Sequence, residues 1–314
     1  MREGLSIWAN PSSPHGEGRR AKQALEDARA RLKSALNWDG EVIFTGGASE
    51  AAQIAFDRAA VLHRAVGAVE HDALYGLMDA HAASLLPVTG DGAIDPERLY
   101  DATARAQRVP DARGNRTMAA IQHINSETGN RQDIAMLAQV VHSNQGLLLV
   151  DCSQSAGKFS LPPEADMAIV SAHKFGGPIG TGALLVKDFA MLSPSGGHER
   201  GYRRGTENMP AILGMVAALE CAGDPYLDPG VVAPFDELAD RLREAGGVWL
   251  DDRLSDPTPY IYALAMPGVS GSAQLMRFDM VGIAVSQGSA CSSGTLKQSH
   301  VMDAIGIDPD TAAR

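Results

Sequence analysis

The sequence predicts an α/β protein with a mostly parallel sheet, followed by a smaller α+β segment. Two observations support this prediction. Short β-rich apolar runs alternate with helical stretches between residues 41 and 187. A Pro- and Asp-rich stretch at 224–234 then separates this region from the rest of the chain. We therefore expect a large domain over residues 1–230 and a small α+β C-terminal domain over 231–314.

The predicted strands are six short apolar runs, at 41–45, 65–70, 117–124, 146–151, 168–171 and 181–186. Helices are predicted at 20–37, which is rich in Ala, Lys, Arg and Glu, and at 208–222, which is apolar and closes the large domain. Open α/β sheets bind ligands beyond the carboxyl ends of their strands. The polar residues that follow each run are therefore the candidates for a binding site.

Charge and hydropathy exclude two classes of partner. The net charge is −11 and the pI about 5.2, so general attraction to nucleic acid or anionic lipid is not expected. We find no apolar run of the roughly 18 to 20 residues that span a bilayer, and the first residues have no apolar signal-peptide core. We expect no membrane association and a cytoplasmic location.

The three cysteines form an odd and widely spaced set, which predicts neither a disulfide framework nor a zinc site. Cys152, at a strand end, and Cys221, in an apolar helix, are interpreted as structural. Cys291 lies in a polar, glycine-punctuated stretch at 286–294, after the apolar alternation at 281–285. Since reactive cysteines are exposed while structural ones are buried, this context favours a nucleophile.

A candidate phosphate site begins where the run at 41–45 passes through Gly46 and Gly47 into a helix. Backbone N–H groups and the helix dipole at such a turn favour an anion. Ser49 as an ordinary helix cap explains the same residues, and the segment alone favours that simpler interpretation.

Polar residues end the next strands. His71 follows one run, Ser126 another, and Asp151 ends a buried one, with Gln154 just beyond it. A carboxylate at the end of a buried strand needs a partner, because burying a lone charge is costly. The partner of Asp151 could be a protonated pyridine nitrogen. Asp151 could equally cap a helix or form an ordinary ion pair.

The segment Ser171-Ala172-His173-Lys174 leads from a strand into a Gly/Pro turn that cannot continue as a helix. Most lysines are surface charges. A lysine that forms a covalent bond to a cofactor, however, must be fixed at a strand end beside phosphate ligands, and Ser171 and His173 can supply these.

Together these residues resemble the class V aminotransferase fold of pyridoxal phosphate (PLP) enzymes, which is PLP-dependent transferase fold type I, and within it the cysteine desulfurases. The resemblance runs from 10–15 to the last residues. It implies that Lys174 carries the PLP, that Asp151 pairs with its pyridine nitrogen, and that His71 stacks on its ring and takes part in proton transfer. The other implied PLP ligands are Ala48, Ser49, Ser171 and His173 for the phosphate, Gln154 and Ser126 near the ring hydroxyl, and Thr206, which reaches the phosphate of the other subunit.

The resemblance also implies a reaction and its partners. L-Cysteine would be converted to L-alanine, with the sulfur taken as a persulfide by Cys291 and passed to a sulfur acceptor or an iron–sulfur scaffold protein. The role of Thr206 implies a homodimer. Ser126 departs from the family, which has an Asn there, and the family's Arg-x-Ser segment for the substrate carboxylate lies beyond Arg314 by family spacing. Two alternatives stay open: another class V enzyme, such as a selenocysteine lyase or an aminotransferase, and a catalytically weak truncated homologue.

Overall fold

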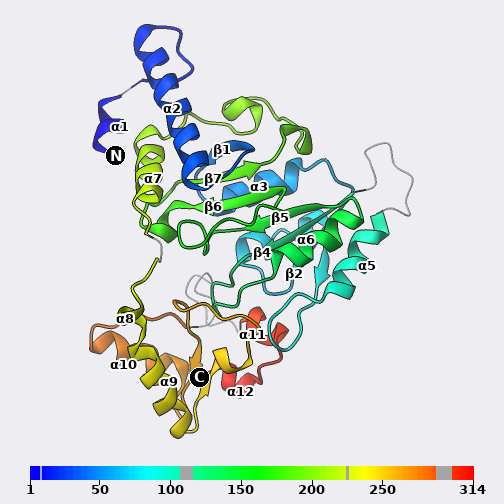
Figure 1. The fold of residues 1–314 in the computed structure, drawn as a ribbon, viewed down its shortest axis with the longest axis vertical. Helices are drawn as coiled ribbons and strands as arrows, with labels where there is room; N and C mark the ends of the chain where they lie inside the picture. The colour runs from blue at the N-terminus through cyan, green and yellow to red at the C-terminus, as the bar shows by residue number, and fades with distance from the viewer. Residues whose placement is uncertain (8, 107–115, 224–225, 288–298) are drawn as a thin grey trace.

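A seven-stranded sheet forms the centre of the larger part of the protein (Figure 1). The computed structural model describes residues 1–7, 9–106, 116–223, 226–287 and 299–314. The strands of this sheet are β1 (Glu41–Thr45), β2 (His63–Gly67), β3 (Ser84–Leu86), β4 (Thr117–Gln122), β5 (Leu147–Asp151), β6 (Met167–Ser171) and β7 (Gly182–Val186). A separate two-stranded sheet consists of β8 (Val248–Trp249) and β9 (Leu264–Ala265).

The large sheet has the strand order β1-β7-β6-β5-β4-β2-β3. Strands β2 to β6 are parallel where they pair, and β7 runs antiparallel to both of its neighbours, β6 and β1. The carboxyl ends of β4, β5 and β6 therefore lie at the same edge, and β7 begins at that edge. The predicted α/β class with a mostly parallel sheet is confirmed.

The six predicted runs all contain strands, with shifted ends. β2 stops at Gly67 because the chain turns there, with the Glu70 N–H bonded to the Gly67 carbonyl at 3.1 Å. β3 was not predicted. It is only three residues long and begins with the polar Ser84, so its sequence contains no apolar run long enough to indicate a strand.

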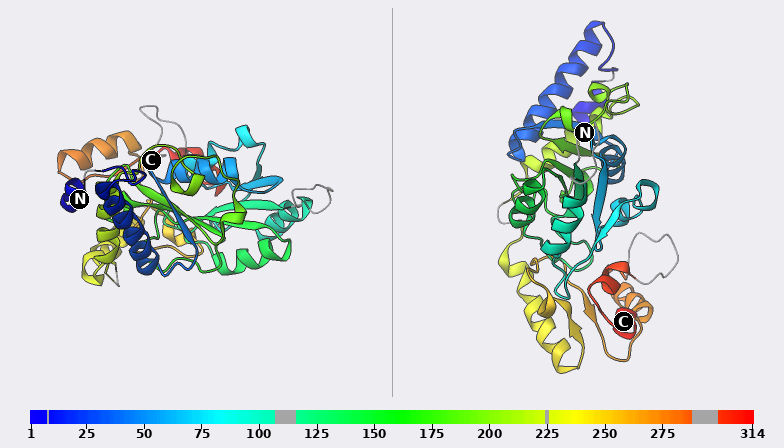
Figure 2. Two further views of the ribbon diagram at one scale, coloured as in Figure 1. Left: turned by 90° about the horizontal axis from the view of Figure 1, so that it is seen from above. Right: turned by 90° about the vertical axis from the view of Figure 1, so that its right-hand side faces the viewer.

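Helices cover both faces of the sheet (Figures 1 and 2). Alternate residues of β5 explain this, since Leu148 and Val150 pack into one apolar core while Leu149 packs into the other. The helices of the larger part are α1 (Arg2–Ser6), α2 (Gly16–Ala35), α3 (Ala48–Arg58), α4 (Asp72–Tyr75), α5 (Pro96–Ala106), α6 (Ile134–Ser143) and α7 (Met209–Glu220), with short 3-10 turns η1 (Asp79–His81), η2 (Ala172–Phe175), η3 (Phe189–Met191) and η4 (Glu199–Gly201). α3 lies on one face, while α2, α6 and α7 lie on the other, with α1 packed against α7.

The C-terminal part surrounds the small sheet with short helices (Figure 1). These are α8 (Pro229–Val232), α9 (Pro234–Glu244), η5 (Leu250–Arg253), α10 (Gly271–Met280), α11 (His300–Ala304) and α12 (Pro309–Ala312). α9 packs on β8 through Leu242 and Trp249. A second cluster places Val301 and Ile305 against Val69, which follows β2, so the two parts share apolar contacts. The division at residues 230 and 231 stays a prediction.

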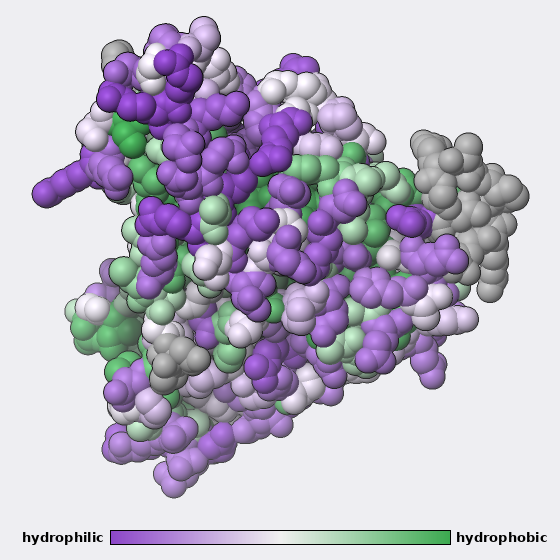
Figure 3. All heavy atoms as spheres, turned by 45° about the horizontal axis from the view of Figure 1, so that its top comes forward, coloured by the Kyte–Doolittle hydropathy of each residue, from purple (hydrophilic) through white to green (hydrophobic). Residues whose placement is uncertain are grey.

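The face drawn in Figure 3 is mainly hydrophilic, with smaller apolar patches between the polar residues. Some exposed apolar residues lie on and after α10: Met280 and Val281 are 83% and 71% exposed. The prediction that Cys221 is structural was wrong, because Cys221 caps the C-terminus of α7 and is exposed, whereas Cys152 is fully buried as expected. Among the helices of the described residues, none is long and apolar enough to cross a membrane.

Candidate active site

A cavity of about 610 Å³ opens at the edge of the sheet where β4, β5 and β6 end and β7 begins. It brings together nine of the predicted site residues: Ala48, Ser49, His71, Ser126, Asp151, Gln154, Ser171, His173 and Lys174. These come from five separate stretches of the chain. The strand topology thus assembles in one place the residues that sequence reasoning could only assign to strand ends.

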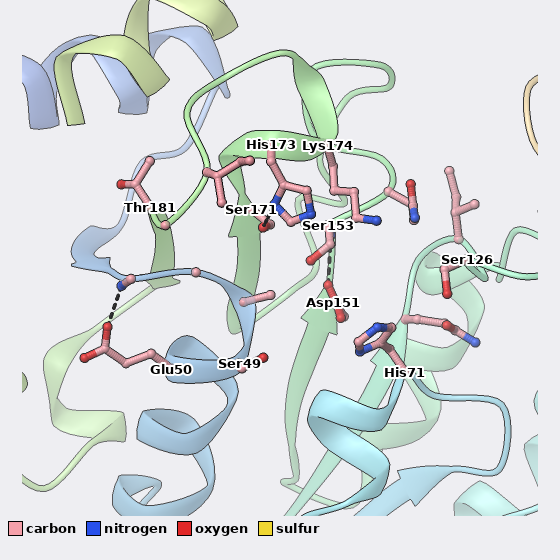
Figure 4. Close-up of a pocket in the computed structure, with 18 residues that line it drawn as sticks. Ser49, Glu50, His71, Ser126, Asp151, Ser153, Ser171, His173, Lys174 and Thr181 are labelled. Atoms are coloured by element: carbon pink, nitrogen blue, oxygen red, sulfur yellow. Dashed lines mark hydrogen bonds between the residues drawn. The ribbon is translucent and has the colours of Figure 1, made fainter. Parts of the chain in front are cut away.

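The glycine turn before α3 forms one wall of the cavity (Figure 4). Gly47 is the N-cap residue of α3, has a φ of 144°, and makes no side-chain capping bond. A Cβ built on Gly47 would meet nothing within 4 Å, so the backbone faces open space. The first N–H groups of this eleven-residue helix are therefore available to an anion. Ser49 as a helix cap was wrong, because α3 already begins at Ala48.

The β6–β7 hairpin forms the opposite wall and carries the lysine. Ser171 Oγ and His173 Nδ1 lie 3.0 Å apart. Burial, and then the charge of Lys174, lower the pKa of His173. The turn closes at Gly176, whose φ of 82° favours glycine, and the chain then reaches Thr181. Figure 4 shows Ser171, His173 and Lys174 close together at this hairpin.

Asp151 forms the floor of the cavity at the end of β5 (Figure 4). It is only 7% exposed, and its Oδ1 accepts a hydrogen bond from the Ser153 N–H at 2.8 Å. Ser153 Oγ is itself buried and has no partner among the described residues. A carboxyl group held this way at the base of a cavity suits a cationic ring nitrogen as its partner.

His71 projects from the segment after β2 (Figure 4). Its Nδ1 accepts a hydrogen bond from the Ala73 N–H at 3.1 Å and so caps α4. In the neutral ring the proton therefore sits on Nε2. Beside it, burial raises the pKa of the Glu70 carboxyl well above its usual range.

Several lining residues were not predicted, among them Thr181, Ile179 and Gln122. Thr181 directly precedes β7. If β7 ran parallel to β6, Thr181 would lie at the opposite edge of the sheet from the cavity. Only the antiparallel direction of β7 brings it to the cavity, and the apolar run at 181–186 contains no signal for strand direction.

Of the remaining two predicted site residues, Thr206 does not line the cavity. Cys291 is outside the described residues. Thr206 is exposed and follows a segment that ion pairs hold to α3 and α2. In that segment Arg203 Nε bonds Glu50 at 3.0 Å, and the buried Glu199 bonds Arg29 at 2.9 Å. These contacts fix the backbone near Thr206 beside the turn that precedes α3.

Comparison with known proteins gives one family. The family model for class V aminotransferases matches residues 5–307. A cysteine desulfurase of Cereibacter sphaeroides is 35% identical over 98% of this chain and 81% of its own length. Cysteine desulfurase IscS 1 of Archaeoglobus fulgidus is 30% identical over 97% of this chain and 82% of its own.

A solved structure agrees with the fold. The NifS-like protein of Rickettsia africae superposes with a TM-score of 0.84 at 24% identity, covering 99% of this chain and 87% of that chain. The arrangement of sheet, helices and C-terminal segment is therefore that of the same fold.

Proposed function

The chain belongs to the class V aminotransferase family, as a member of its cysteine desulfurases, and from this premise we propose which of its residues carry out the reaction. The enzyme is PLP-dependent. The proposed conversion is L-cysteine plus an enzyme thiol to L-alanine plus an enzyme persulfide. The carbon–sulfur bond of the substrate breaks and a sulfur–sulfur bond forms, so the sulfur is oxidised and the substrate carbon is reduced and protonated.

The residues present fit PLP. The open backbone turn at Gly47 and the uncapped start of α3 suit its phosphate, with Ser171 and His173 as further ligands. Asp151 is buried, and its Oδ1 accepts a hydrogen bond from the Ser153 N–H. This carboxyl group suits the protonated ring nitrogen. Lys174 would form the covalent link to the cofactor. When bound, PLP supplies an electron sink for the carbon atoms of the substrate.

The remaining roles belong to side chains around the cavity. Lys174 would also move a proton at the substrate α-carbon. His71 would act in the same proton transfer as a donor through Nε2, because its Nδ1 already accepts a hydrogen bond from the Ala73 N–H. Gln154 would donate its amide N–H to the ring oxygen, and Ser126 adds a shorter polar group nearby. Cys291 is proposed as the sulfur nucleophile from its sequence context.

A homodimer with shared sites is part of the proposal. It is supported by the ion pairs that hold the segment before Thr206 next to the turn before α3 while Thr206 itself stays exposed. Thr206 is proposed to reach the phosphate bound by the partner subunit. Light scattering of the purified protein tests the dimer, and Thr206→Val would weaken PLP binding only if this threonine contributes to the site.

The observation that carries the proposal is that Lys174, Asp151 and the start of α3, which are far apart in the sequence, surround one cavity. The test incubates the PLP-loaded protein with L-cysteine and measures alanine and sulfide. Lys174→Ala is expected to lose the yellow colour of the lysine-linked cofactor and all alanine formation. Cys291→Ala is expected to keep the colour and to lose alanine formation, while Cys221→Ala serves as the matched thiol control.

Two outcomes contradict parts of this proposal. Alanine production that does not depend on Cys291 would show that the persulfide step is wrong. An unmodified, yellow protein that forms no alanine from L-cysteine would refute the desulfurase activity while leaving PLP binding intact.

A further inference from the structure

Gln154 and Lys158 lie on the same side of the turn that follows β5. Backbone bonds from the Ala156 N–H to the Cys152 carbonyl (2.8 Å) and from the Phe159 N–H to the Ser155 carbonyl (2.9 Å) give this turn a helical spacing. Residues four apart then face each other. Accordingly, Lys158 Nζ donates to Gln154 Oε1 over 3.4 Å.

This contact decides which way the Gln154 amide faces. An ammonium group can only donate hydrogen bonds, so the amide oxygen of Gln154 must be the atom turned toward Lys158. The amide nitrogen, with its two donors, is then left for the cavity that Gln154 lines. Without the cation the two ends of the amide are nearly equivalent in shape, and either could face the cavity.

Two tyrosines hold Lys158 in place: Tyr226 in the segment after α7, and Tyr260 in the C-terminal part. Its Nζ lies 4.8 Å from the centre of the Tyr260 ring and 5.3 Å from that of Tyr226. The two rings meet edge to face at 5.9 Å. The Tyr260 hydroxyl also donates to the backbone carbonyl of Gln154 at 2.9 Å. The side chain and the backbone of Gln154 are thus both fixed, and one of the contacts comes from 106 residues further along the chain.

We propose that Lys158 is a positioning residue, which acts through Gln154 by holding its amide oxygen away from the cavity so that its amide nitrogen donates to the PLP ring oxygen. This inference rests on the proposed function, because it concerns the same cofactor site. Through Tyr260, it also makes the orientation of Gln154 depend on the docking of the C-terminal part against the turn.

The electrostatic setting suits this role. Burial, followed by the positive charge of Lys174, lowers the pKa of Lys158 to about 8. Near pH 7 most Lys158 side chains therefore still carry their proton and can donate to Gln154. Contacts of the ammonium with the ring faces of Tyr260 and Tyr226 compensate part of its lost hydration.

The test measures PLP binding rather than turnover. Apo-protein is titrated with PLP, and the dissociation constant and the position of the visible absorbance band are recorded at one fixed pH. A hydrogen bond to an ionised oxygen is worth about 1.5–3 kcal/mol, so losing it altogether would raise the dissociation constant about tenfold or more. Because the freed amide of Gln154 can still turn its nitrogen to the cavity, Lys158→Met is expected to raise the dissociation constant about two- to tenfold and to shift the band. Lys158→Arg, which keeps a donor cation, is expected to stay near the unmodified protein.

Two controls separate positioning from general stabilisation. Lys187 has similar contacts elsewhere in the protein: its Nζ lies 4.6 Å from the centre of the Trp38 ring and donates to Asp39 Oδ1 at 2.7 Å. Lys187→Met is therefore the first control, and it is expected to leave PLP binding unchanged. In a Gln154→Ala background, Lys158→Met is expected to have little further effect, because its target is gone. Should Lys158→Met fail to fold, Lys158→Leu, which also lacks a donor, replaces it in the same series.

The inference is overturned if Lys158→Met binds PLP as the unmodified protein does. It is equally overturned if Lys158→Met weakens binding by the same factor with and without Gln154. Failure of the proposed function has a different signature, in which the unmodified protein itself forms no yellow complex with PLP.

Discussion

Replacing Glu199 by Gln tests whether the segment before Thr206 is held by a buried ion pair. The Glu199 side chain is fully buried and accepts three hydrogen bonds, from Arg29 Nη1 at 2.9 Å, from Arg29 Nη2 at 3.1 Å and from the Phe44 N–H at 2.8 Å. The Arg29 side chain is only 6% exposed, and its guanidinium lies 4.9 Å from the centre of the Phe44 ring.

The expected magnitude follows from what the substitution leaves behind. Glu199→Gln keeps the shape of the side chain but removes its negative charge. Among the described residues, Arg29 then remains buried with only the partly exposed Glu26, at 3.4 Å, as a counter-ion. Removing one partner of a buried pair typically costs about 3–5 kcal/mol, because the other charge is left without compensation. We expect Glu199→Gln to lower the free energy of unfolding by about that amount.

Chemical denaturation followed by circular dichroism measures this change. Glu220→Gln is the matched control, because Glu220 pairs with Arg31 at 2.5 Å while both side chains are about 40% exposed (44% and 39%). Exposed pairs contribute about 0–1 kcal/mol, so the control is expected to change little. Equal and small losses in both variants would refute the reasoning, as would a Glu199→Gln variant as stable as the unmodified protein.

Three further predictions use other features. Iodoacetamide is expected to label the exposed Cys221 quickly and the buried Cys152 only on unfolding, because burial raises the pKa of its thiol; site-resolved mass spectrometry that finds Cys152 labelled first would contradict this. Burial, and then the charge of Arg131, lower the pKa of His123 from 6.5 to about 4, so the unfolded chain binds its proton more readily and up to about 3 kcal/mol of stability is lost as the pH falls from 6.5 to 4. Urea unfolding of His123→Gln should lose less stability across that range, and an identical pH profile would count against it. Gly182→Ala would place a Cβ 2.9 Å from the Gly47 Cα, so we expect about 1–3 kcal/mol of destabilisation together with weaker PLP binding; a variant unchanged in both measurements would show that the contact relaxes freely.

Sequence reasoning located the residues at the ends of strands because an apolar run followed by a polar residue is a local signal. Asp151, Ser171 and Lys174 are such residues, and the parallel sheet then brings them together without further information. Strand direction and long-range pairing have no such signal. Thr181 reaches the cavity only because β7 is antiparallel. Tyr260 contacts Gln154 only once the C-terminal part has docked.

The misassignment of Cys221 has a similar cause. An apolar helix predicts which residues are buried on average, but α7 has little difference in polarity between its faces, and Cys221 caps its end. Burial there depends on what lies beyond the helix, which local sequence does not determine. The simpler interpretation of Ser49 as a helix cap was wrong for a related reason, since the start of a helix after two glycines is ambiguous by one or two residues.

The antiparallel β7 also has a consequence for folding kinetics. A parallel strand after β6 would need a long crossover, but β7 returns as a hairpin, with Ser171 paired to Gly182. Lys174 therefore lies in a loop that closes over about ten residues, which is fast and of low contact order. We expect amide hydrogens of β6 and β7 to gain protection from exchange early during refolding. The lysine would then hold its local geometry before the distant segments that carry His71 and Tyr260 have docked.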